Sequence, residues 1–469
     1  MSEPWMLVSP ETTPMLEPEF RPAVLAHRAF LEAVEATGGG EPLVLGLERG
    51  DGSVSRYETR VFRDAHPKSE ANLFFAERLL KFLLWQRGAY RVYVGGSPEI
   101  ARFLKKCYAP GGLRAFDAEF MGRDVYEKDF EVVHCAPNEV PDTRETASSL
   151  GRHLNGCRIG FDLGASDRKV SAVMDGNPVF SEEVIWEPAK HADPAYHYNE
   201  IMAALRSAAA HLPRVDAIGG SSAGVYVNNR PMVASLFRAV PRERYGEIRD
   251  LFVRISREMG VPLVVVNDGE VTALAGSMAL EDHAVLGVAL GSSEAGGYVT
   301  PEGQITGWLN ELAFCPVDYN PDAAIDEWSK DFGVGAKYFS QQCVFRLCNR
   351  AGIQLPANIT DAERLKFVQE KLDAGHPGAQ AIWRTMGVFL GYGLAYYAHF
   401  YQLRHVLVLG RCTSGRGGDL LVSEARGVLE REFPDIAAAV RIHLPDEKIR
   451  RVGQSIAAAS LPDISQAGQ

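Results

Sequence analysis

The sequence predicts an α/β protein with two lobes, preceded by an additional α/β domain. Short apolar strands alternate with helical patterns from residue 157 to about residue 460, and two hairpins within this stretch have loops of small polar residues. The length agrees with this division. A chain of 469 residues, 46% of them hydrophobic and 23% charged, buries more than one core and should form two or three domains.

The composition excludes several classes of partner. A formal net charge of -11 argues against nucleic acid, because phosphate backbones are bound by clustered Lys and Arg. No apolar run reaches the ~20 residues that span a bilayer, and residues 1–20 lack the basic and apolar stretches of a secretory signal. The 7 cysteines are scattered without a CxxC pair, which predicts free thiols. We therefore expect a cytoplasmic protein whose partner is a small molecule.

Turn-forming residues and changes of pattern indicate the domain boundaries. We expect an irregular N-terminal arm, an accessory α/β domain, two lobes and a flexible tail, at residues 1–40, 41–150, 151–275, 276–460 and 461–469. The arm contains one helical pattern, over 23–36, which ends at three glycines.

The accessory domain shows a core of its own but no strong chemical motif. It begins with a hairpin, LGLERGDGSVSR, that faintly echoes IGFDLGASDRKVS at the start of the first lobe. Such hairpins are common, so an internal duplication stays open. We expect the domain to dock on the first lobe and to mediate self-association into a homo-oligomer, most simply a dimer.

The first chemical motif is the loop of the hairpin at the start of the first lobe. Strands are predicted over 159–161 and 169–174, with an acidic Gly/Ser loop between them. Small residues let backbone N–H groups approach an anion, Ser166 can donate from its hydroxyl, and Asp162 can hold Mg²⁺ through water. The alternative is an ordinary tight turn.

The second motif follows a buried strand predicted over 262–266, which ends at Asn267 and Asp268. Open α/β sheets gather their ligands at the carboxyl ends of such strands. A carboxylate there can orient a hydroxyl and accept its proton during phosphoryl transfer, which makes Asp268 a candidate base. The alternative is that Asp268 merely caps the helix that follows.

Two further Gly loops lie in the second lobe. The strand predicted over 285–290 leads into Gly291, Ser292 and Ser293, which together with the Asp162 loop could hold one polyphosphate from two sides. The loop from Gly410 to Thr413 lies between a strand and a helix and could seat the adenosine end of a nucleotide. Glu311, between these loops in the chain, could accept hydrogen bonds from sugar hydroxyls.

The order of these motifs resembles the actin-like ATPase (ribonuclease H-like) superfamily, and most closely the bacterial ROK family, over residues 157–460. The family motifs DxGGT, GxxGPVD…N, NDxN, GTGxGGG and GExGH are matched in turn at 162–166, 219–229, 267–270, 291–297 and 310–314. The pattern and the resemblance together imply catalysis by Asp268, substrate contacts from Asn228, Asn229, Asn267 and Glu311, and nucleotide contacts from Asp162, Gly164, Ser166, Gly291, Ser292, Ser293, Gly410 and Thr413.

The sequence also departs from the family pattern. Phe314 replaces the His of GExGH, which binds sugar and metal in zinc-containing members, and the CxCGxxGC zinc motif is missing, so no zinc is expected. Glu294 would place a negative charge in a phosphate loop and repel the nucleotide. Glu270 stands in place of the second Asn of NDxN. The first 150 residues match neither the usual kinase start nor the family's DNA-binding domain.

The resemblance therefore implies a carbohydrate kinase that uses ATP and Mg²⁺ to phosphorylate a hydroxyl of a sugar or related polyol by in-line transfer. Two alternatives stay open. One is a sugar- or nucleotide-binding regulatory protein with a kinase-like cleft and little catalysis, and the other is an ATPase that drives a partner protein.

Overall fold

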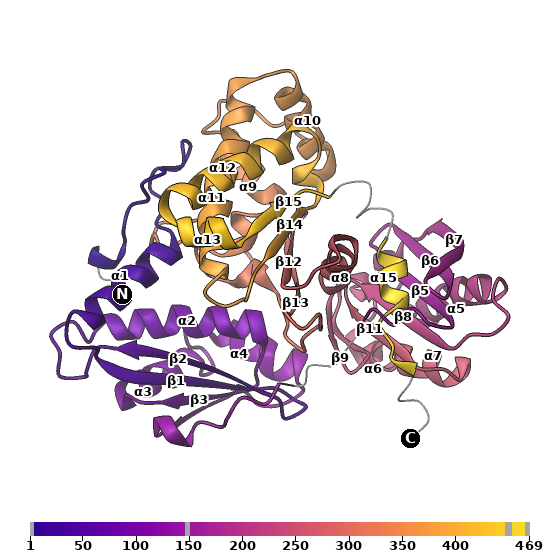
Figure 1. Cartoon of the computed structure of the whole chain (residues 1–469), viewed down its shortest axis with the longest axis horizontal. Helices are drawn as coiled ribbons and strands as arrows, with labels where there is room; N and C mark the ends of the chain where they lie inside the picture. Colours follow the sequence, from indigo (N-terminus) through magenta and orange to yellow (C-terminus); the bar gives the residue numbers. More distant parts are fainter. Residues whose placement is uncertain (1–3, 146–150, 446–452, 465–469) are drawn as a thin grey trace. The chain divides into compact units, whose positions relative to one another are not determined.

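The computed structural model describes residues 4–145, 151–445 and 453–464, and the chain divides into two compact units (Figure 1). The first unit comprises Met1–Thr146, Val288–Gly296 and Trp308–Leu444, and the second comprises Ala147–Gly287, Gly297–Gly307 and Pro445–Gln469. Each unit is therefore assembled from segments that lie far apart in the sequence.

The N-terminal part of the first unit is built on a four-stranded sheet in the order β2-β1-β3-β4. Its elements are β1 (Glu41–Glu48), β2 (Val54–Val61), α2 (Ala71–Arg87), β3 (Arg91–Gly95), α3 (Pro98–Cys107), α4 (Ala115–Glu119) and β4 (Glu131–Cys135). The long helix α2 runs along the sheet in Figure 1 and is almost entirely buried. A helix buried all round must pack against more than its own sheet.

The pairing of this sheet does not support an internal duplication. Strand β1 pairs antiparallel with β3, whereas β5 (Cys157–Leu163), the strand of the second unit that the echo would match, pairs parallel with β8 (Ala217–Ser222). The similarity of the two hairpins is therefore local, as expected when turn chemistry alone selects the residues.

The arm before this sheet is ordered against the rest of the first unit. The Thr12 N–H donates to the Tyr392 hydroxyl at 3.1 Å, and the Phe20 ring lies 4.7 Å from the Phe389 ring. The helix predicted over 23–36 is present as α1 (Ala23–Glu35).

A second four-stranded sheet has the order β13-β12-β14-β15. Its strands are β12 (Val285–Leu290), β13 (Glu294–Val299), β14 (His405–Leu409) and β15 (Arg441–His443), and the accompanying helices are α9 (Gln341–Cys348), α10 (Asp361–Asp373), α11 (Pro377–Tyr397), α12 (Arg416–Glu432) and α13 (Pro434–Ala439). Glycines bring α11 and α12 close together, because a Cβ at Gly391 would lie 2.6 Å from the Cβ of Val428.

The second unit contains a five-stranded sheet in the order β11-β8-β5-β6-β7. Its other elements are β6 (Asp167–Met174), β7 (Asn177–Ile185), α5 (Pro194–Ala209), β9 (Val225–Val227), β10 (Arg230–Val233), α6 (Tyr245–Arg249), α7 (Leu251–Met259), β11 (Leu263–Asn267), α8 (Asp268–Leu280) and α15 (Gln454–Ala459). The three antiparallel strands predicted at the start of the lobe are present as β5, β6 and β7, and β8 and β11 extend the sheet in parallel.

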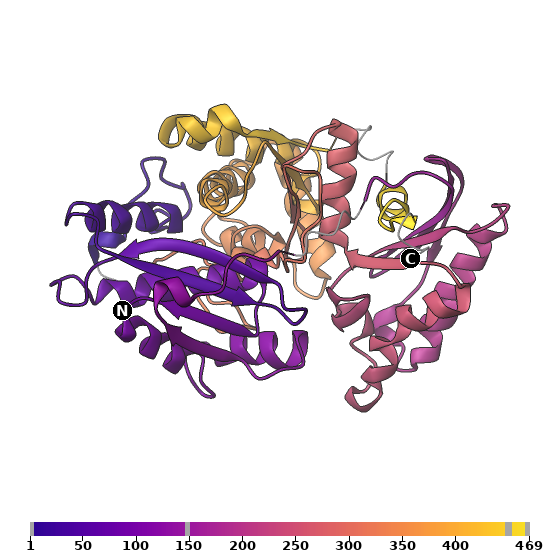
Figure 2. The same cartoon turned by 60° about the horizontal axis from the view of Figure 1, so that its bottom comes forward.

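The short helix α15 lies directly on this sheet, in yellow beside the strands in Figure 1 and Figure 2. Glycines in the strands make the contact possible. A Cβ at Gly160 would lie 1.6 Å from the Ser455 carbonyl oxygen, and one at Gly219 would lie 1.7 Å from that of Ala458. Any larger residue at either position would push the helix away.

The packing differs from the expected domain organisation. The N-terminal domain packs within the unit that contains residues 308–444, so the expected docking on the first lobe is wrong. Residues 453–460 were expected in the second lobe, but they belong to the unit of residues 151–275, and residues 446–452 lie outside the described residues. Leu461 is fully buried, so the expected flexible tail does not begin there, and residues 465–469 of that tail lie outside the described residues.

The cysteines agree with the prediction from their spacing. All are free thiols, and all but Cys135 are buried. Within the described parts of the chain, no helix combines the length and the apolar character needed to cross a membrane.

Candidate active site

Asp162 lies near the carboxyl end of β5, opposite Ser221 of the parallel strand β8. The Ser221 hydroxyl donates to Asp162 Oδ1 at 2.6 Å. Burial raises the pKa of Asp162 to about 6; the hydrogen bond from Ser221 opposes this rise, and the negative charge of Asp268 adds to it. The predicted Mg²⁺ ligand is therefore a buried carboxyl held by a neighbouring strand.

The loop after Asp162 is the tight turn that the sequence predicts. The Gly164 N–H donates to the Asp167 carbonyl at 2.9 Å, and the Trp186 indole donates to the Gly164 carbonyl at 2.9 Å. Ser166 is exposed, and its hydroxyl donates to the Asp167 carboxylate at 3.0 Å. The turn is thus held at fixed points while its tip faces solvent.

Asn267, at the end of β11, is the residue that caps α8. Its Oδ1 accepts from the Gly269 N–H at 2.7 Å, and its Nδ2 donates to the Gly224 carbonyl at 2.7 Å. The alternative in which Asp268 is the cap is therefore wrong. The Asn267 amide, expected to contact substrate, is engaged in positioning the backbone around Asp268.

Asp268 is the first residue of α8 and follows directly on β11. This strand lies at the edge of the sheet, and only its residues Leu263 and Val265 are buried, so the prediction of a buried strand was wrong. The Gly269 N–H donates to the Asp268 carboxylate at 3.0 Å, and the backbone of Asp268 itself makes a further hydrogen bond to it. Burial raises the pKa of Asp268 above its ordinary value. A carboxylate with a raised pKa is suited to accept a proton.

The oxygen atoms at the carboxyl ends of these strands suit Mg²⁺ as ligands. Asp162, Ser221 and Asp268 offer oxygen ligands only, and Mg²⁺ is usually held by one or two carboxylates while it keeps several waters. In the described ranges, no group of three or more His, Cys, Asp or Glu side chains is arranged to enclose a metal ion. These residues therefore fit a hydrated cation that also needs ligands from another molecule.

Asn228 and Asn229 form the turn between β9 and β10, with φ angles of 52° and 62°. The Asn229 Nδ2 donates to the Leu263 carbonyl at 2.8 Å, and its Oδ1 accepts from the Val265 N–H at 2.8 Å. Asn229 therefore fastens the turn to β11 rather than presenting its amide to a ligand. This use was not visible in the sequence, because it depends on which strand the turn meets.

The two Gly loops of the first unit lie against each other. Gly410 has a φ of 98°, and a Cβ on it would lie 2.5 Å from the Leu290 carbonyl oxygen at the end of β12. The Thr413 hydroxyl donates to the Gly410 carbonyl at 2.8 Å. Ser292 and Ser293 are exposed at the neighbouring turn, so both predicted nucleotide loops open at one edge of the same sheet.

Glu294 does not act as expected from its place in the phosphate loop. It begins β13 and is buried, with the Tyr397 hydroxyl donating to its Oε1 at 2.9 Å. Burial raises the pKa of Glu294 to about 8, so the side chain carries a proton at pH 7. The expected repulsion of phosphate is therefore wrong, because the side chain is directed into the core and is uncharged there.

Glu311 lies in a segment that rests on the N-terminal domain. Its N–H donates to the Trp85 carbonyl at 3.0 Å, and the ring of Phe314 lies 4.2 Å from that of Trp85. Glu270, the other departure from the family pattern, is buried, and its carboxylate accepts from the Tyr298 N–H at 3.1 Å. Phe314, which stands at the position of the motif His, therefore makes an aromatic contact with Trp85.

The structure groups the predicted residues within each unit. Asp162, Asn267 and Asp268 gather at the carboxyl ends of β5 and β11 in the second unit, whereas the Gly291 and Gly410 loops gather in the first. The sequence placed Ser221 within the motif at 219–229 but did not predict its hydrogen bond to Asp162. Its signal is the pairing of β8 with β5, which no local pattern contains.

The chain was compared with known proteins. No family model matches the sequence, and no curated protein matches it. Among solved structures, a ROK family transcriptional regulator, a homologue of the E. coli MLC protein, is 17% identical over 67% of this chain and 79% of its own, with a TM-score of 0.54.

Two enzymes of the same family are also similar. A ROK family glucokinase from Streptomyces griseus, in complex with glucose and AMPPNP, is 20% identical over 65% of this chain and 98% of its own, with a TM-score of 0.48. A ROK hexokinase from Thermus thermophilus is 16% identical over 65% and 96%, with a TM-score of 0.49. The similarity to the regulator shows that this chain has the fold of the ROK family, as its motifs predicted.

Proposed function

We propose that this protein is a ROK-type carbohydrate kinase that uses ATP and Mg²⁺ to phosphorylate a hydroxyl of a sugar or related polyol. The observation that carries the proposal is Asp268. It stands at the carboxyl end of the parallel strand β11, its carboxylate is hydrogen-bonded by backbone groups of Asp268 and Gly269, and burial raises its pKa.

The proposed reaction is an in-line transfer of the γ-phosphoryl group. The acceptor hydroxyl oxygen forms a bond to phosphorus, the bond from phosphorus to the oxygen bridging to ADP breaks, and the hydroxyl proton passes to the Asp268 carboxylate. The backbone N–H groups of the Asp162 loop and those of the Gly291 loop are each suited to bind phosphate oxygens. Mg²⁺ near Asp162, when bound, supplies positive charge that offsets the negative charge of the phosphates.

Two specific observations favour one of the alternative functions. The solved structure with the higher TM-score is a transcriptional regulator, and the motif His is replaced by Phe314, which packs against Trp85. Both observations favour a regulatory protein that binds a sugar or a nucleotide with little catalysis. Asp268 argues for the kinase, because a regulator that only binds sugar needs no group ready to take a proton.

The test is to measure ADP release by the purified full chain with ATP and Mg²⁺ against a panel of monosaccharides and polyols. A kinase releases ADP only when its sugar is present. A regulator binds a member of the panel, detected as a thermal shift, without ADP release. Release that is independent of every sugar indicates an ATPase, and would overturn the proposal.

Self-association and location complete the proposal. We expect a homodimer, which light scattering would report as twice the chain mass of 51.4 kDa, and a monomer mass would remove that part. Seven free thiols support a reducing compartment such as the cytoplasm.

A further inference from the structure

The segment of residues 308–315, which contains Glu311, lies on the C-terminal end of α2. The Asn310 N–H donates to the Gln86 carbonyl at 2.8 Å, and the Glu311 N–H donates to the Trp85 carbonyl at 3.0 Å. The Cys315 thiol donates to the Phe82 carbonyl at 3.6 Å. The Trp85 and Gln86 carbonyls at the end of the helix therefore accept from the backbone of this segment, and the Phe82 carbonyl accepts from one of its side chains.

These contacts answer a requirement of the helix itself. The last carbonyls of an α-helix have no partner within the helix, and when buried they need one from outside. In α2 the Leu84 carbonyl accepts from the Gly88 N–H at the cap, and the Trp85 and Gln86 carbonyls accept from the segment. The helix end and the segment complete each other, so the backbone at Glu311 is placed by α2.

Side chains of the N-terminal domain hold both ends of the segment. At the start, the Trp308 indole donates to Glu145 Oε2 at 3.1 Å, and the Arg87 guanidinium lies 4.8 Å above the Trp308 ring. At the end, the Phe314 ring lies 4.2 Å from the ring of Trp85. The segment is therefore fixed by the domain along its whole length.

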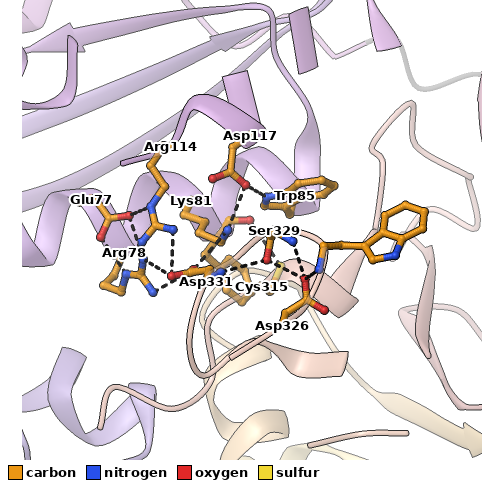
Figure 3. A network of polar contacts seen from close by, with 12 residues as sticks. Glu77, Arg78, Lys81, Trp85, Arg114, Asp117, Cys315, Asp326, Ser329 and Asp331 are labelled. Carbon is orange, nitrogen blue, oxygen red and sulfur yellow. Dashed lines mark hydrogen bonds and ion pairs between the residues drawn. The ribbon is translucent and has the colours of Figure 1, made fainter. Parts of the chain in front are cut away.

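Within the first unit, a buried ion network holds helix α2 to the segment that contains Asp331, as Figure 3 shows. Asp331 accepts from Arg78 at 3.1 and 3.2 Å and from Arg114 at 2.8 Å, and lies 3.2 Å from the Lys81 ammonium. All four side chains are buried. Burial alone would lower the pKa of Lys81, but the Asp117 and Asp331 carboxylates outweigh it and raise that pKa.

The same network sets the orientation of Trp85. Its indole Nε1 donates to Asp117 Oδ1 at 2.6 Å, and the Lys81 ammonium donates to the same oxygen at 2.9 Å, as Figure 3 shows. The Trp85 ring cannot turn away from Phe314 without leaving a buried carboxylate short of a donor, which is costly.

We propose that the N-terminal domain is the positioning part of the candidate sugar site, and that Trp85 is its positioning residue for Glu311. The inference rests on the proposed function for the identity of the ligand, but not for the positioning. A backbone held in advance of binding gains affinity for the residue it carries, because the ligand does not have to order that segment. The domain is thus a support for the substrate segment, where the sequence suggested packing, self-association or a wall of the substrate cleft.

The experiment compares two single variants of the full chain, Phe116→Leu and Trp85→Phe. Phe116 is half-buried, and its ring lies 6.1 Å from that of Phe314, whereas Trp85→Phe keeps a ring but removes the donor to Asp117. The matched control is Phe130→Leu, a half-buried phenylalanine of the same domain that stacks on Tyr108 at 5.2 Å. Amide hydrogen exchange of a peptide covering 308–315 is measured for each protein, with KM for the sugar found active and Kd for AMPPNP.

In both test variants we expect faster exchange in that peptide and a rise of about tenfold in the sugar KM, with the AMPPNP Kd unchanged within about twofold. The control should change none of these. Unaltered exchange in both folded variants, or exchange that rises equally across the whole chain, would overturn the positioning role. Faster exchange with an unchanged KM would remove Glu311 from sugar binding, and faster exchange in a protein that phosphorylates no sugar would contradict the proposed function alone.

Discussion

The Tyr397 hydroxyl donates a 2.9 Å hydrogen bond to one carboxylate oxygen of Glu294, and within the described chain the other oxygen has no partner. Burial raises the pKa of Glu294 to about 8 from an ordinary value of 4.5. The folded state therefore keeps a proton that the unfolded state releases between these values. Stability falls as pH rises from about 4.5 to about 8, and Asp318, whose pKa burial raises to about 7, acts in the same direction.

Glu294→Gln should remove the contribution of Glu294 to the pH dependence of stability, since an amide of the same shape has no proton to lose. We expect the variant to gain up to a few kcal/mol over the natural protein at pH 8.5 and to lose this advantage near pH 5. Urea unfolding across that pH range measures it, with the exposed Glu302→Gln as control. A pH dependence identical to that of the natural protein would show that Glu294 is ionised in the fold.

Asp268→Asn should lower kcat by about 10² to 10⁴ and leave the Kd values of sugar and AMPPNP nearly unchanged. The amide keeps the shape of the side chain but cannot accept the hydroxyl proton. Steady-state kinetics and calorimetric titration separate the two effects. Full activity in the variant would remove Asp268 from the mechanism.

Asp331→Asn should destabilise the first unit by about 3–5 kcal/mol, because Arg78, Lys81 and Arg114 would keep their charges in a buried site without the central carboxylate. Chemical denaturation measures the loss. The control is Asp322→Asn, an exposed position in the same connecting segment, which should change stability by less than about 0.5 kcal/mol. Equal stability of both variants would mean that the network contributes little.

The proposed kinase activity should require added Mg²⁺ and no zinc. The residues at Asp162 and Asp268 offer oxygen ligands, whereas zinc sites in proteins use mainly Cys and His. Activity should disappear with EDTA and return with Mg²⁺ but not with Zn²⁺. Elemental analysis that finds about one tightly held zinc per chain would contradict this expectation.

Much of the second unit and of the nucleotide loops followed from the sequence. Apolar strands and turn residues act over neighbouring positions, so the β5–β6 turn, the strand before Asp268 and the Gly291 turn were predicted close to where they occur. The family motifs are equally local. The order of these motifs was enough to predict the ROK fold, although no family model matches the sequence.

Only the tertiary structure decided what each side chain does. Glu294 faces a core that Tyr397 helps to form, Asn229 is engaged by a strand more than 30 positions later, and the N-terminal domain joins residues 308–444 through the contact of Arg78 with Asp331. Periodicity and turn chemistry report only on near neighbours in the chain. Burial and charge pairing depend on residues that folding brings together from hundreds of positions apart, so the sequence alone determined the motifs while the packing determined their use.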